Sequence, residues 1–337
     1  MNKIIRSICY FGESFNHDMI EKSAEIENIL RTHWFEIQTK RICLKNNDWT
    51  VDPWILLEQW ILLSLWDFSY KTLDPIFEQF LNSQNITINL DLTNETIEEK
   101  HINLLYEIIN ENPSKTFNFT YTFNNKTASP YFPSAKYEKN WFSIWLQPTD
   151  LSENCKTLDE WLLNMEEAWN ELIGLFKNDS EFLWIDSSVA PLFEWKSSLI
   201  DFINRLWVDF SSSVTTDIYT QITNFIKRQN PKPVWLCWLM FPCLEDFELA
   251  SEYSVWNFSI ERNIFLSLHS WLWIDTYPIW INQNKKKVAD ILKLVQALSN
   301  KYSKPLSVRF VSDWKAKIWE MTDFKNQYLK DVIVREL

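Results

Sequence analysis

The stretch "HSWLWIDTYPIWIN", residues 269–282, places three tryptophans around an Asp-Thr pair and a proline. The pattern is typical of a strand that ends in a tight turn, where bulky side chains are unusual. The chain has 337 residues, with 20 Trp and only 2 Gly. Glycine normally makes up about 7% of residues, or roughly 24 in a chain of this length. The turn therefore raises the question of whether tryptophan stands where glycine is expected.

Short apolar segments alternate with amphipathic segments along the chain, which favours parallel βα units and an α/β fold in a single domain over residues 1–337. Strands are predicted at residues 4–11, 35–44, 116–122, 142–146, 182–185, 234–240 and 306–311. Helices are predicted at residues 18–31, 95–110, 158–176, 199–206, 214–228, 260–268 and 285–302. The clearest long loop is predicted at residues 127–139.

Charge and cysteine content restrict the class of protein. The net charge of -12 argues against binding to nucleic acid or to an anionic membrane surface. The N-terminal segment lacks the apolar core of a signal peptide. The five cysteines form no close CxxC pair, so neither a disulfide framework nor a zinc knuckle is expected. We expect a soluble cytoplasmic protein with no nucleic-acid or membrane partner, and a homo-oligomer remains open.

Several tryptophans lie at predicted junctions between elements. Trp34 and Trp207 each come between a helix and a following extended segment, where a left-handed residue, commonly glycine, ends many helices. Trp314 and Trp319 lie in a predicted loop after a strand. A residue with a Cβ atom loses roughly 1–2 kcal/mol in the left-handed conformation. We therefore expect many tryptophans to be exposed, crowded at turns, or at positive φ.

The hypothesis that follows concerns the genetic code. A gene read with UGA as tryptophan, from an organism that decodes UGA as glycine, would produce many tryptophans and few glycines. Trp161 and Trp169 lie inside a predicted helix and fit either residue. The alternatives are a tryptophan-rich core, or an aromatic platform for sugars with its rings in an exposed row.

With glycine at these positions, the chain resembles an uncharacterised family, domain of unknown function 711, also called UPF 0210. The resemblance rests, in chain order, on "IIRSICYF", "HWFEIQTKRI", "SPYFPSAKYEKNWFSIWL", "WIDSSVAPL", "WLMFPCLEDFELA", "WLWIDTYPIWI", "KPLSVRF", "WKAKIWEMTDF" and "YL". It extends from about residue 4 to residue 330. Glycine is expected from the family or from turn chemistry at Trp34, Trp141, Trp145, Trp184, Trp207, Trp235, Trp238, Trp271, Trp273, Trp280, Trp314 and Trp319.

The resemblance implies a closed α/β barrel of about ten strands with outer helices, similar to that of pyruvate formate-lyase-like enzymes. It does not imply glycyl radical chemistry, because the C-terminal "NQYLKDVIVREL" has neither a glycine nor a tryptophan in its place. The chain also departs from the family. It has "DFSSSVTTD" where the family tends to have a glycine-rich stretch, and His269-Ser270 where a cysteine is expected. A thiol-dependent role at that point is therefore in doubt.

Polar residues near the predicted strand ends are the candidates for a site, since parallel α/β folds build their sites beyond those ends. Four carboxylates are candidates for acid–base catalysis or for holding a hard divalent cation: Asp186, Glu245, Asp246 and Asp275. The expected substrate-binding residues are Gln38, Thr39, Arg41, Ser187, Thr276, Arg309 and Lys315. Of these, Arg41, Arg309 and Lys315 are suited to a carboxylate or phosphate.

Each candidate has a structural alternative. Glu245 and Asp246 precede a predicted helix, where acidic side chains interact favourably with the helix dipole. Asp186 is suited to a cap or turn, and Asp275-Thr276 precedes a proline-containing turn. Arg41 and Arg309 are also suited to pairing with these carboxylates inside the fold. The four histidines are scattered, so a zinc site is not expected.

Two functions of different classes remain. One is an enzyme that acts on a small anionic metabolite at the mouth of the barrel, by a reaction that the sequence does not identify. The other is a non-catalytic small-molecule binder or regulatory protein. Two carboxylates and an arginine within hydrogen-bonding distance in one pocket would favour the enzyme. Side chains that are spread apart, or closed into paired salt bridges with no cavity, would favour the binder.

Overall fold

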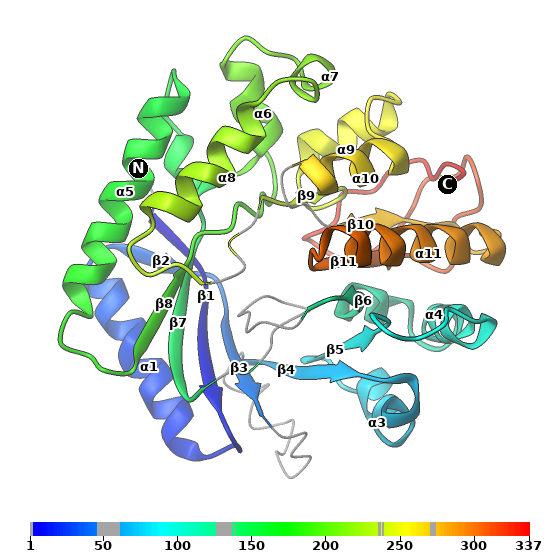
Figure 1. Ribbon diagram of the computed structural model, residues 1–337, viewed down its shortest axis with the longest axis horizontal. Helices are drawn as coiled ribbons and strands as arrows, with labels where there is room; N and C mark the ends of the chain where they lie inside the picture. Colours follow the sequence, from blue (N-terminus) through cyan, green and yellow to red (C-terminus); the bar gives the residue numbers. More distant parts are fainter. Residues whose placement is uncertain are drawn as a thin grey trace.

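A computed structural model describes residues 3–45, 61–125, 137, 139–234, 237, 239–269 and 274–337, and its strands lie at the centre of a shell of helices (Figure 1). The strands are β1 Lys3–Gly12, β2 Phe35–Ile37, β3 Lys40–Leu44, β4 Ile61–Phe68, β5 Ile86–Asp91, β6 Phe119–Phe123, β7 Trp141–Leu146, β8 Phe182–Asp186, β9 Phe241–Pro242, β10 Ile274–Pro278 and β11 Leu306–Val311. The helices are α1 His17–Thr32, α3 Tyr70–Asn82, α4 Glu99–Glu111, α5 Leu158–Leu175, α6 Leu199–Arg205, α7 Phe210–Ser213, α8 Ile218–Gln229, α9 Phe247–Ser254, α10 Ile260–His269 and α11 Lys285–Tyr302, with short 3-10 helices η1 Pro113–Asn118, η2 Thr149–Ser152 and η3 Trp195–Ser197.

All eleven strands belong to one sheet, in which ten follow the order β8-β7-β1-β3-β4-β5-β6-β11-β10-β9 and β2 pairs with β1. Strands β1, β3, β4, β5 and β6 are mutually parallel, and so are β7 with β8 and β9 with β10 and β11. The first of these groups, β1 to β6, is antiparallel to the other two, through the pairs β1/β7 and β6/β11. The predicted mixed α/β fold with parallel βα units is therefore confirmed.

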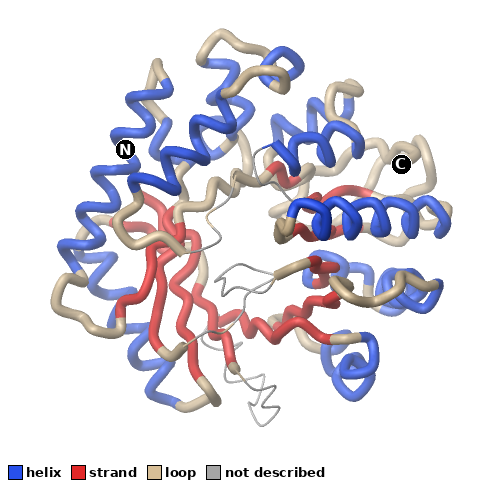
Figure 2. The backbone as a smooth tube through the Cα atoms, in the orientation of Figure 1, coloured by secondary structure: helices blue, strands red, loops and turns tan. Residues whose placement is uncertain are grey.

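The segment after β8 pairs with the segment around β9. Isolated bridges join Val189 to Leu239 and Phe193 to Asp246, both in parallel register. The amide of Met240 also donates to the carbonyl oxygen of Val189 at 2.8 Å. Strands from both ends of the sheet order consequently curve around a common centre (Figure 2).

Most predicted elements are present, but several boundaries differ. The strand predicted at residues 35–44 is two short strands, β2 and β3, both paired with β1, with Gln38 and Thr39 between them. Strand β4, strand β5 and helix α3 were not predicted, and α3 contains Pro75 in its first turns. Asp275 and Thr276 lie within β10 rather than after a strand. Most of the predicted loop at residues 127–139 lies outside the described residues, as does part of the strand predicted at 234–240.

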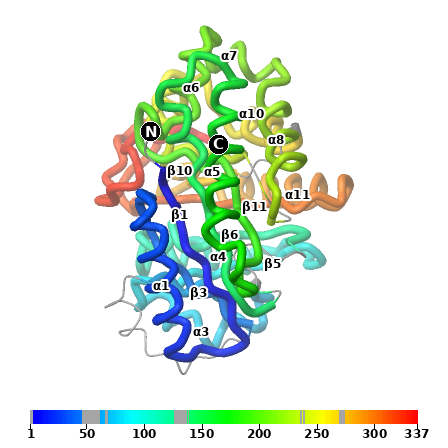
Figure 3. The backbone as a smooth tube through the Cα atoms, turned by 90° about the vertical axis from the view of Figure 1, so that its left-hand side faces the viewer, coloured from blue at the N-terminus to red at the C-terminus, as the bar shows by residue number. Residues whose placement is uncertain are grey.

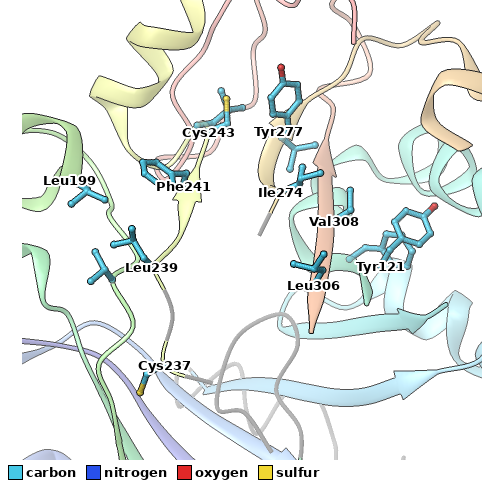
Figure 4. Packing of buried hydrophobic residues seen from close by; sticks show 14 of the residues in the cluster. Tyr121, Leu199, Cys237, Leu239, Phe241, Cys243, Ile274, Tyr277, Leu306 and Val308 are labelled. Carbon is cyan, nitrogen blue, oxygen red and sulfur yellow. The ribbon is translucent and has the colours of Figure 1, made fainter. Parts of the chain in front are cut away.

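One face of the sheet is apolar and covered by helices. Strand β5 contributes Ile88 and Leu90, β6 contributes Phe119, Tyr121 and Phe123, and β11 contributes Leu306, Val308 and Phe310, all buried in the main core. Figure 4 shows Phe241, Ile274 and Val308, which are register partners on β9, β10 and β11. Helices α1, α3 and α11 contact the strands from this outer side, and α1 and α5 are nearest the viewer in Figure 3. Burying this face supplies the main favourable free energy of folding.

The opposite face of the sheet, which we call the inner face, is mostly polar and equally buried. Its members include Ser7, Arg41, Ser64, Thr87, Asn89, Thr120, Thr122, Ser143, Asp186, Ser307 and Arg309, each 3% exposed or less. In an antiparallel sheet with one wet face such residues would contact solvent. Here they are buried, next to a small apolar cluster of Cys9, Phe11 and Cys43, so this face of the sheet is largely but not wholly polar.

Seven tryptophans have an unusual backbone. Twelve described residues other than glycine have positive φ, and seven of them are Trp34, Trp141, Trp195, Trp207, Trp256, Trp314 and Trp319. The same seven side chains are exposed, up to 88% for Trp34 and 96% for Trp207. The prediction of exposed tryptophans at positive φ is confirmed for these seven. Trp161 and Trp169, by contrast, are fully buried in α5.

No helix in the described part of the chain has the length and apolar character needed to cross a membrane.

Candidate functional site

Two acidic side chains and two arginines meet where the first residues of β10 lie beside β11 and the loop after β9, within reach of the first half of β1. Arg309 of β11 donates from Nε to Asp275 Oδ1 and from Nη2 to Glu245 Oε1, each at 2.5 Å. Its Nη1 donates to the carbonyl oxygen of Phe117 at 3.1 Å. Because the two carboxylates come from β10 and from the loop after β9, Arg309 ties three neighbouring segments together.

Arg6 of β1 reaches the same carboxylate from the opposite side. Its Nη2 donates to Glu245 Oε2 at 3.3 Å and its Nη1 to Gln38 Oε1 at 3.1 Å. The side chain is 15% exposed, against 4% for Arg309. We call Arg6, Glu245, Asp275 and Arg309 the charge cluster. Arg6 is its most accessible cation, and the cluster has no net formal charge.

The environment of Glu245 favours its protonated form. Burial raises the pKa of Glu245, and repulsion from Asp275 adds to the rise, while Arg309 and Arg6 oppose it. A carboxyl group with a raised pKa holds a proton more readily and is suited to accepting and returning one. Glu245 is therefore the side chain of the cluster best suited to acid–base chemistry.

Thr276 completes the β10 side of the cluster. Its amide donates to Asp275 Oδ1 at 3.0 Å, and its hydroxyl accepts from the amide of Leu244 at 3.4 Å. Its φ is 41°, an uncommon conformation for a β-branched residue. Strained backbone of this kind concentrates at functional sites, where surrounding contacts enforce it.

A third arginine, Arg41, lies beside the charge cluster on the inner face. The guanidinium carbons of Arg6 and Arg41 lie 5.9 and 6.0 Å from the ring of Trp145, so one indole is contacted by both cations. Arg41 is the second residue of β3 rather than the end of a strand, and it is 3% exposed. Burial lowers its pKa, while the charge of Asp186 opposes that shift.

Asp186 bonds within its own loop, whereas Ser187 bonds to the residue that caps the end of α8. Asp186 ends β8 and accepts at Oδ1 from the amide and hydroxyl of Ser188, at 2.9 and 2.6 Å. The hydroxyl of Ser187 accepts from Asn230 Nδ2 at 2.8 Å.

The hydroxyl of Thr39 donates to the carbonyl oxygen of Arg6 at 2.6 Å, which holds the start of β3 against β1.

Asp246 occupies the starts of two helices. Its carboxylate accepts from the Leu249 amide at 3.2 Å as the N-cap of α9. It also accepts from the Ser198 hydroxyl at 2.6 Å and the Leu199 amide at 3.0 Å, where α6 begins. These bonds match the helix-start alternative, since amides at helix starts need acceptors. Asp246 is adjacent in sequence to Glu245 but directed away from the charge cluster.

Lys315 lies in a surface pocket of about 660 Å³ formed by η1 and the C-terminal segment. The pocket is lined in part by Phe117, Asp313 and Tyr328. Phe117 separates the pocket from the charge cluster, because its carbonyl oxygen and ring both contact Arg309. Tyr328 stacks on Phe117, with ring centroids 6.5 Å apart.

The candidate residues thus fall into different groups. Glu245, Asp275, Arg309 and Gln38 come together with Arg6, which the sequence analysis did not select as a site residue. Arg6 had a detectable signal, since it is a charged residue within the apolar strand "IIRSICYF". Convergence of two carboxylates with an arginine was expected for an enzyme. The same side chains are closed into salt bridges, and they do not line the pocket described above.

A divalent cation has little support from the donor chemistry. Glu245 and Asp275 are both neutralised by guanidinium groups at 2.5 Å. Among the residues that the structure covers, no three His, Cys, Asp or Glu side chains gather as potential ligands. We therefore assign no step to a metal ion.

Comparison with known proteins identifies the family. No curated protein matches the chain. A family model described as uncharacterised ACR (DUF711) matches residues 78–325. That range includes Glu245, Asp275 and Arg309 and most of the sheet. The chain therefore belongs to the DUF711 family of uncharacterised proteins.

Proposed function

We propose that the protein is an enzyme that acts on a small anionic metabolite, with the charge cluster as its site. The observation that carries this proposal is the convergence of Arg6 and Arg309 on Glu245 from two sides. Buried ion pairs contribute little net stability compared with apolar packing, so an extended buried cluster is better explained by a role in binding or chemistry.

Arg6 and Arg41 are the proposed anion contacts. Both guanidinium groups face the ring of Trp145. If position 145 is glycine in the native protein, the indole is absent and the two cations face the same space. A carboxylate or phosphate there would gain charge-assisted hydrogen bonds from both. In that arrangement Gln38 orients Arg6, and Lys315 attracts anions at the surface pocket.

Glu245 is the proposed acid–base group. It touches both Arg6 and Arg309, so a bound anion on Arg6 would be adjacent to its carboxyl group. Asp275 and Arg309 are positioning residues that hold Glu245 in place. Burial raises the pKa of Glu245, which favours a role in accepting and returning a proton. We expect proton transfer to a substrate carbon or oxygen, and no radical chemistry.

The test separates binding from turnover. Calorimetric titration with inorganic phosphate and with hexanoate should detect binding that Arg6→Gln weakens at least about tenfold, the effect of one lost charge-assisted hydrogen bond. Arg31→Gln is the control, because Arg31 pairs with Glu27 on the exposed surface of α1. A mixture of small organic acids and phosphates, followed by mass spectrometry, should show one compound consumed. Glu245→Gln should slow that consumption by roughly 10² to 10⁴ while binding remains.

A non-catalytic binder is the second candidate, favoured by the closed salt bridges of the charge cluster. This function predicts anion binding that depends on Arg6, with no compound consumed from the mixture. Absence of binding to either anion would contradict both functions.

A closed barrel of ten strands is our proposed description of the sheet. It is supported by the order of the ten strands, the two parallel sets, and the bridges between the segments after β8 and around β9. Such a barrel, similar to that of pyruvate formate-lyase-like enzymes, would close the polar inner face on itself. An experimental structure with continuous hydrogen bonds between β8 and β9 would establish closure.

Recoding of UGA as glycine is our proposed origin of most tryptophans. It is supported by seven exposed tryptophans at positive φ, the conformation that glycine adopts without steric cost. Trp195 and Trp256 are two further positions of this kind, which are not among the twelve where the sequence analysis expects glycine. Trp235, Trp238, Trp271 and Trp273 lie outside the described residues. Peptide mass spectrometry on natively produced protein should find glycine at positions 34 and 207, and tryptophan there would contradict the proposal.

A further inference from the structure

Three neighbouring strands carry buried polar side chains with no hydrogen-bond partner. Asn89 of β5, Thr120 of β6 and Ser307 of β11 are 0%, 1% and 2% exposed. Asn89 Nδ2 and Oδ1, Thr120 Oγ1 and Ser307 Oγ make no hydrogen bond to any residue that the structure describes. We call these three residues the inner polar patch. A buried polar atom without a partner costs roughly 1–3 kcal/mol, so proteins seldom retain several side by side.

Strand register places the patch beside the charge cluster. Asn89 is the register partner of Thr120, and Thr122 is the partner of Ser307 in the antiparallel β6/β11 pair. Thr120 therefore lies opposite Arg309, one position beyond the last paired residues, Val308 and Tyr121. Since side chains alternate between faces, Asn89, Thr120, Ser307 and Arg309 all project from the inner face.

The inner face has hydroxyl groups with and without partners, because Thr87 is within reach of partners whereas Ser143 Oγ of β7 also makes no hydrogen bond to the described residues. Thr87 lies two residues before Asn89 on the same strand, and its hydroxyl is within 3.4 Å of Ser64 Oγ and 3.5 Å of the Leu63 carbonyl oxygen. Asn89, Thr120 and Ser307 differ from Ser143 because they lie on the three adjacent strands β5, β6 and β11, within two residues of Arg309 or of its neighbour on β6. Their adjacency to the charge cluster is the observation on which the inference rests.

We infer that the anionic ligand of the charge cluster carries a neutral, polyhydroxylated portion that binds Asn89, Thr120 and Ser307. The inference rests on the proposed function and adds the substrate class, a sugar-acid-like carboxylate or phosphate. Asn89 offers one donor group and one acceptor, and Thr120 and Ser307 each offer a hydroxyl that donates and accepts. Alcohol groups match both requirements, whereas an aliphatic chain would leave all four atoms unpartnered.

The experiment compares two carboxylates of equal carbon number. Gluconate bears hydroxyl groups along its chain, and hexanoate bears none. Calorimetric titration of the natively produced chain should give a Kd for gluconate at least about tenfold lower than for hexanoate, the effect of two or three added hydrogen bonds. Thr120→Val preserves side-chain shape and should remove much of this difference. Asn89→Leu is a second variant of similar volume, and Thr87→Val is the control that keeps the difference.

The outcomes separate this inference from the function on which it rests. Equal Kd values for gluconate and hexanoate would overturn the polyhydroxylated ligand and leave the anion site intact, with water alone satisfying the patch. A preference for gluconate that survives both Thr120→Val and Asn89→Leu would also overturn the inference. Binding of neither carboxylate would overturn the anion site itself, and the inference with it.

Discussion

The outer and inner faces of strands β5, β6 and β11 are equally buried but chemically opposite. Leu90, Phe123 and Val308 on the outer face belong to the main apolar core. Asn89, Thr122 and Arg309 are their alternating neighbours on the inner face, and all are 3% exposed or less. Burial of the outer face accounts for folding, whereas burial of polar groups on the inner face is costly. The comparison suggests that the outer face was selected for stability and the inner face for function.

Replacement of Arg309 on the inner face should cause the largest loss of stability. Arg309→Met leaves Glu245 and Asp275 buried without their closest cation, and we expect the free energy of unfolding to fall by about 3–5 kcal/mol. Urea denaturation measures the change, with Arg31→Met on the exposed surface as a control expected to cost less than about 1 kcal/mol. A loss for Arg309→Met no larger than for the control would mean that the cluster is accessible to water.

The next largest effect should be the pH dependence of stability that arises from Asp246, at the starts of α6 and α9. Burial raises the pKa of Asp246 to about 7, above the ordinary value of 3.8. A carboxyl group with a raised folded-state pKa stabilises the fold below about pH 4, and this contribution is lost as the pH rises to 7. The loss is on the order of 4 kcal/mol at most. Asp246→Asn should flatten the decline in unfolding free energy between pH 4 and 8; an unchanged slope would assign the decline to other groups.

Truncation on the outer face should have a similar but slightly smaller effect. Leu90→Ala removes buried methyl groups from β5 and is expected to cost about 3 kcal/mol, through lost burial and a residual cavity. Leu163→Ala, at a position 58% exposed on α5, should change stability by less than about 1 kcal/mol. Ligand affinity should remain unchanged in Leu90→Ala if the two faces have separate roles.

Replacement of Trp207, which lies on neither face of the sheet, should raise the free energy of unfolding. Trp207 is 96% exposed with φ of 63°, so Trp207→Gly relieves steric strain without removing core contacts. In the tryptophan-containing chain we expect stability to rise by about 1 kcal/mol. Trp207→Ala retains a Cβ atom and should gain much less. Equal stability of the glycine and alanine variants would show that strain at this position is negligible.

The smallest change should come from the inner polar patch. Asn89→Leu replaces an amide without partners by an apolar side chain of similar volume, so the unfolding free energy should change by less than about 1 kcal/mol or increase. Thermal denaturation without ligand measures this change. A large loss of stability would show that Asn89 is bonded in the folded protein and is part of the structural framework.

How much could be predicted from the sequence differs between the two faces. The alternation of strands and helices identified the α/β class because helical and strand periods of the outer-face residues are distinct. Strand β5, "ITINLD", was missed although its alternation of apolar and polar residues is typical of a strand. With only 2 Gly, the sequence lacks many of the signals that normally separate short strands from loops.

The candidate site was predictable only in part. Glu245, Asp275 and Arg309 were selected from their positions near strand ends, and the structure brings them together. Arg6 was missed because it lies at the beginning of β1, and a rule based on strand ends excludes such residues. In this sheet β1 and β6 run antiparallel to β7 and β11, so Arg6 in the first half of β1 meets residues of strands that run in the opposite direction. Sequence periodicity does not reveal that arrangement.

The central position of β1 has a consequence for synthesis of the chain. β1 pairs with β3 but also with β7, and β6 pairs with β11, so two edges of the first half remain bare until later residues leave the ribosome. Bare edges and exposed apolar surface promote aggregation of nascent chains. Helices α1, α3 and α4 are made early enough to cover the apolar face, and the other face is rich in hydroxyl and amide groups that water can solvate. The same chemistry that suits a ligand would thus keep the unfinished protein soluble.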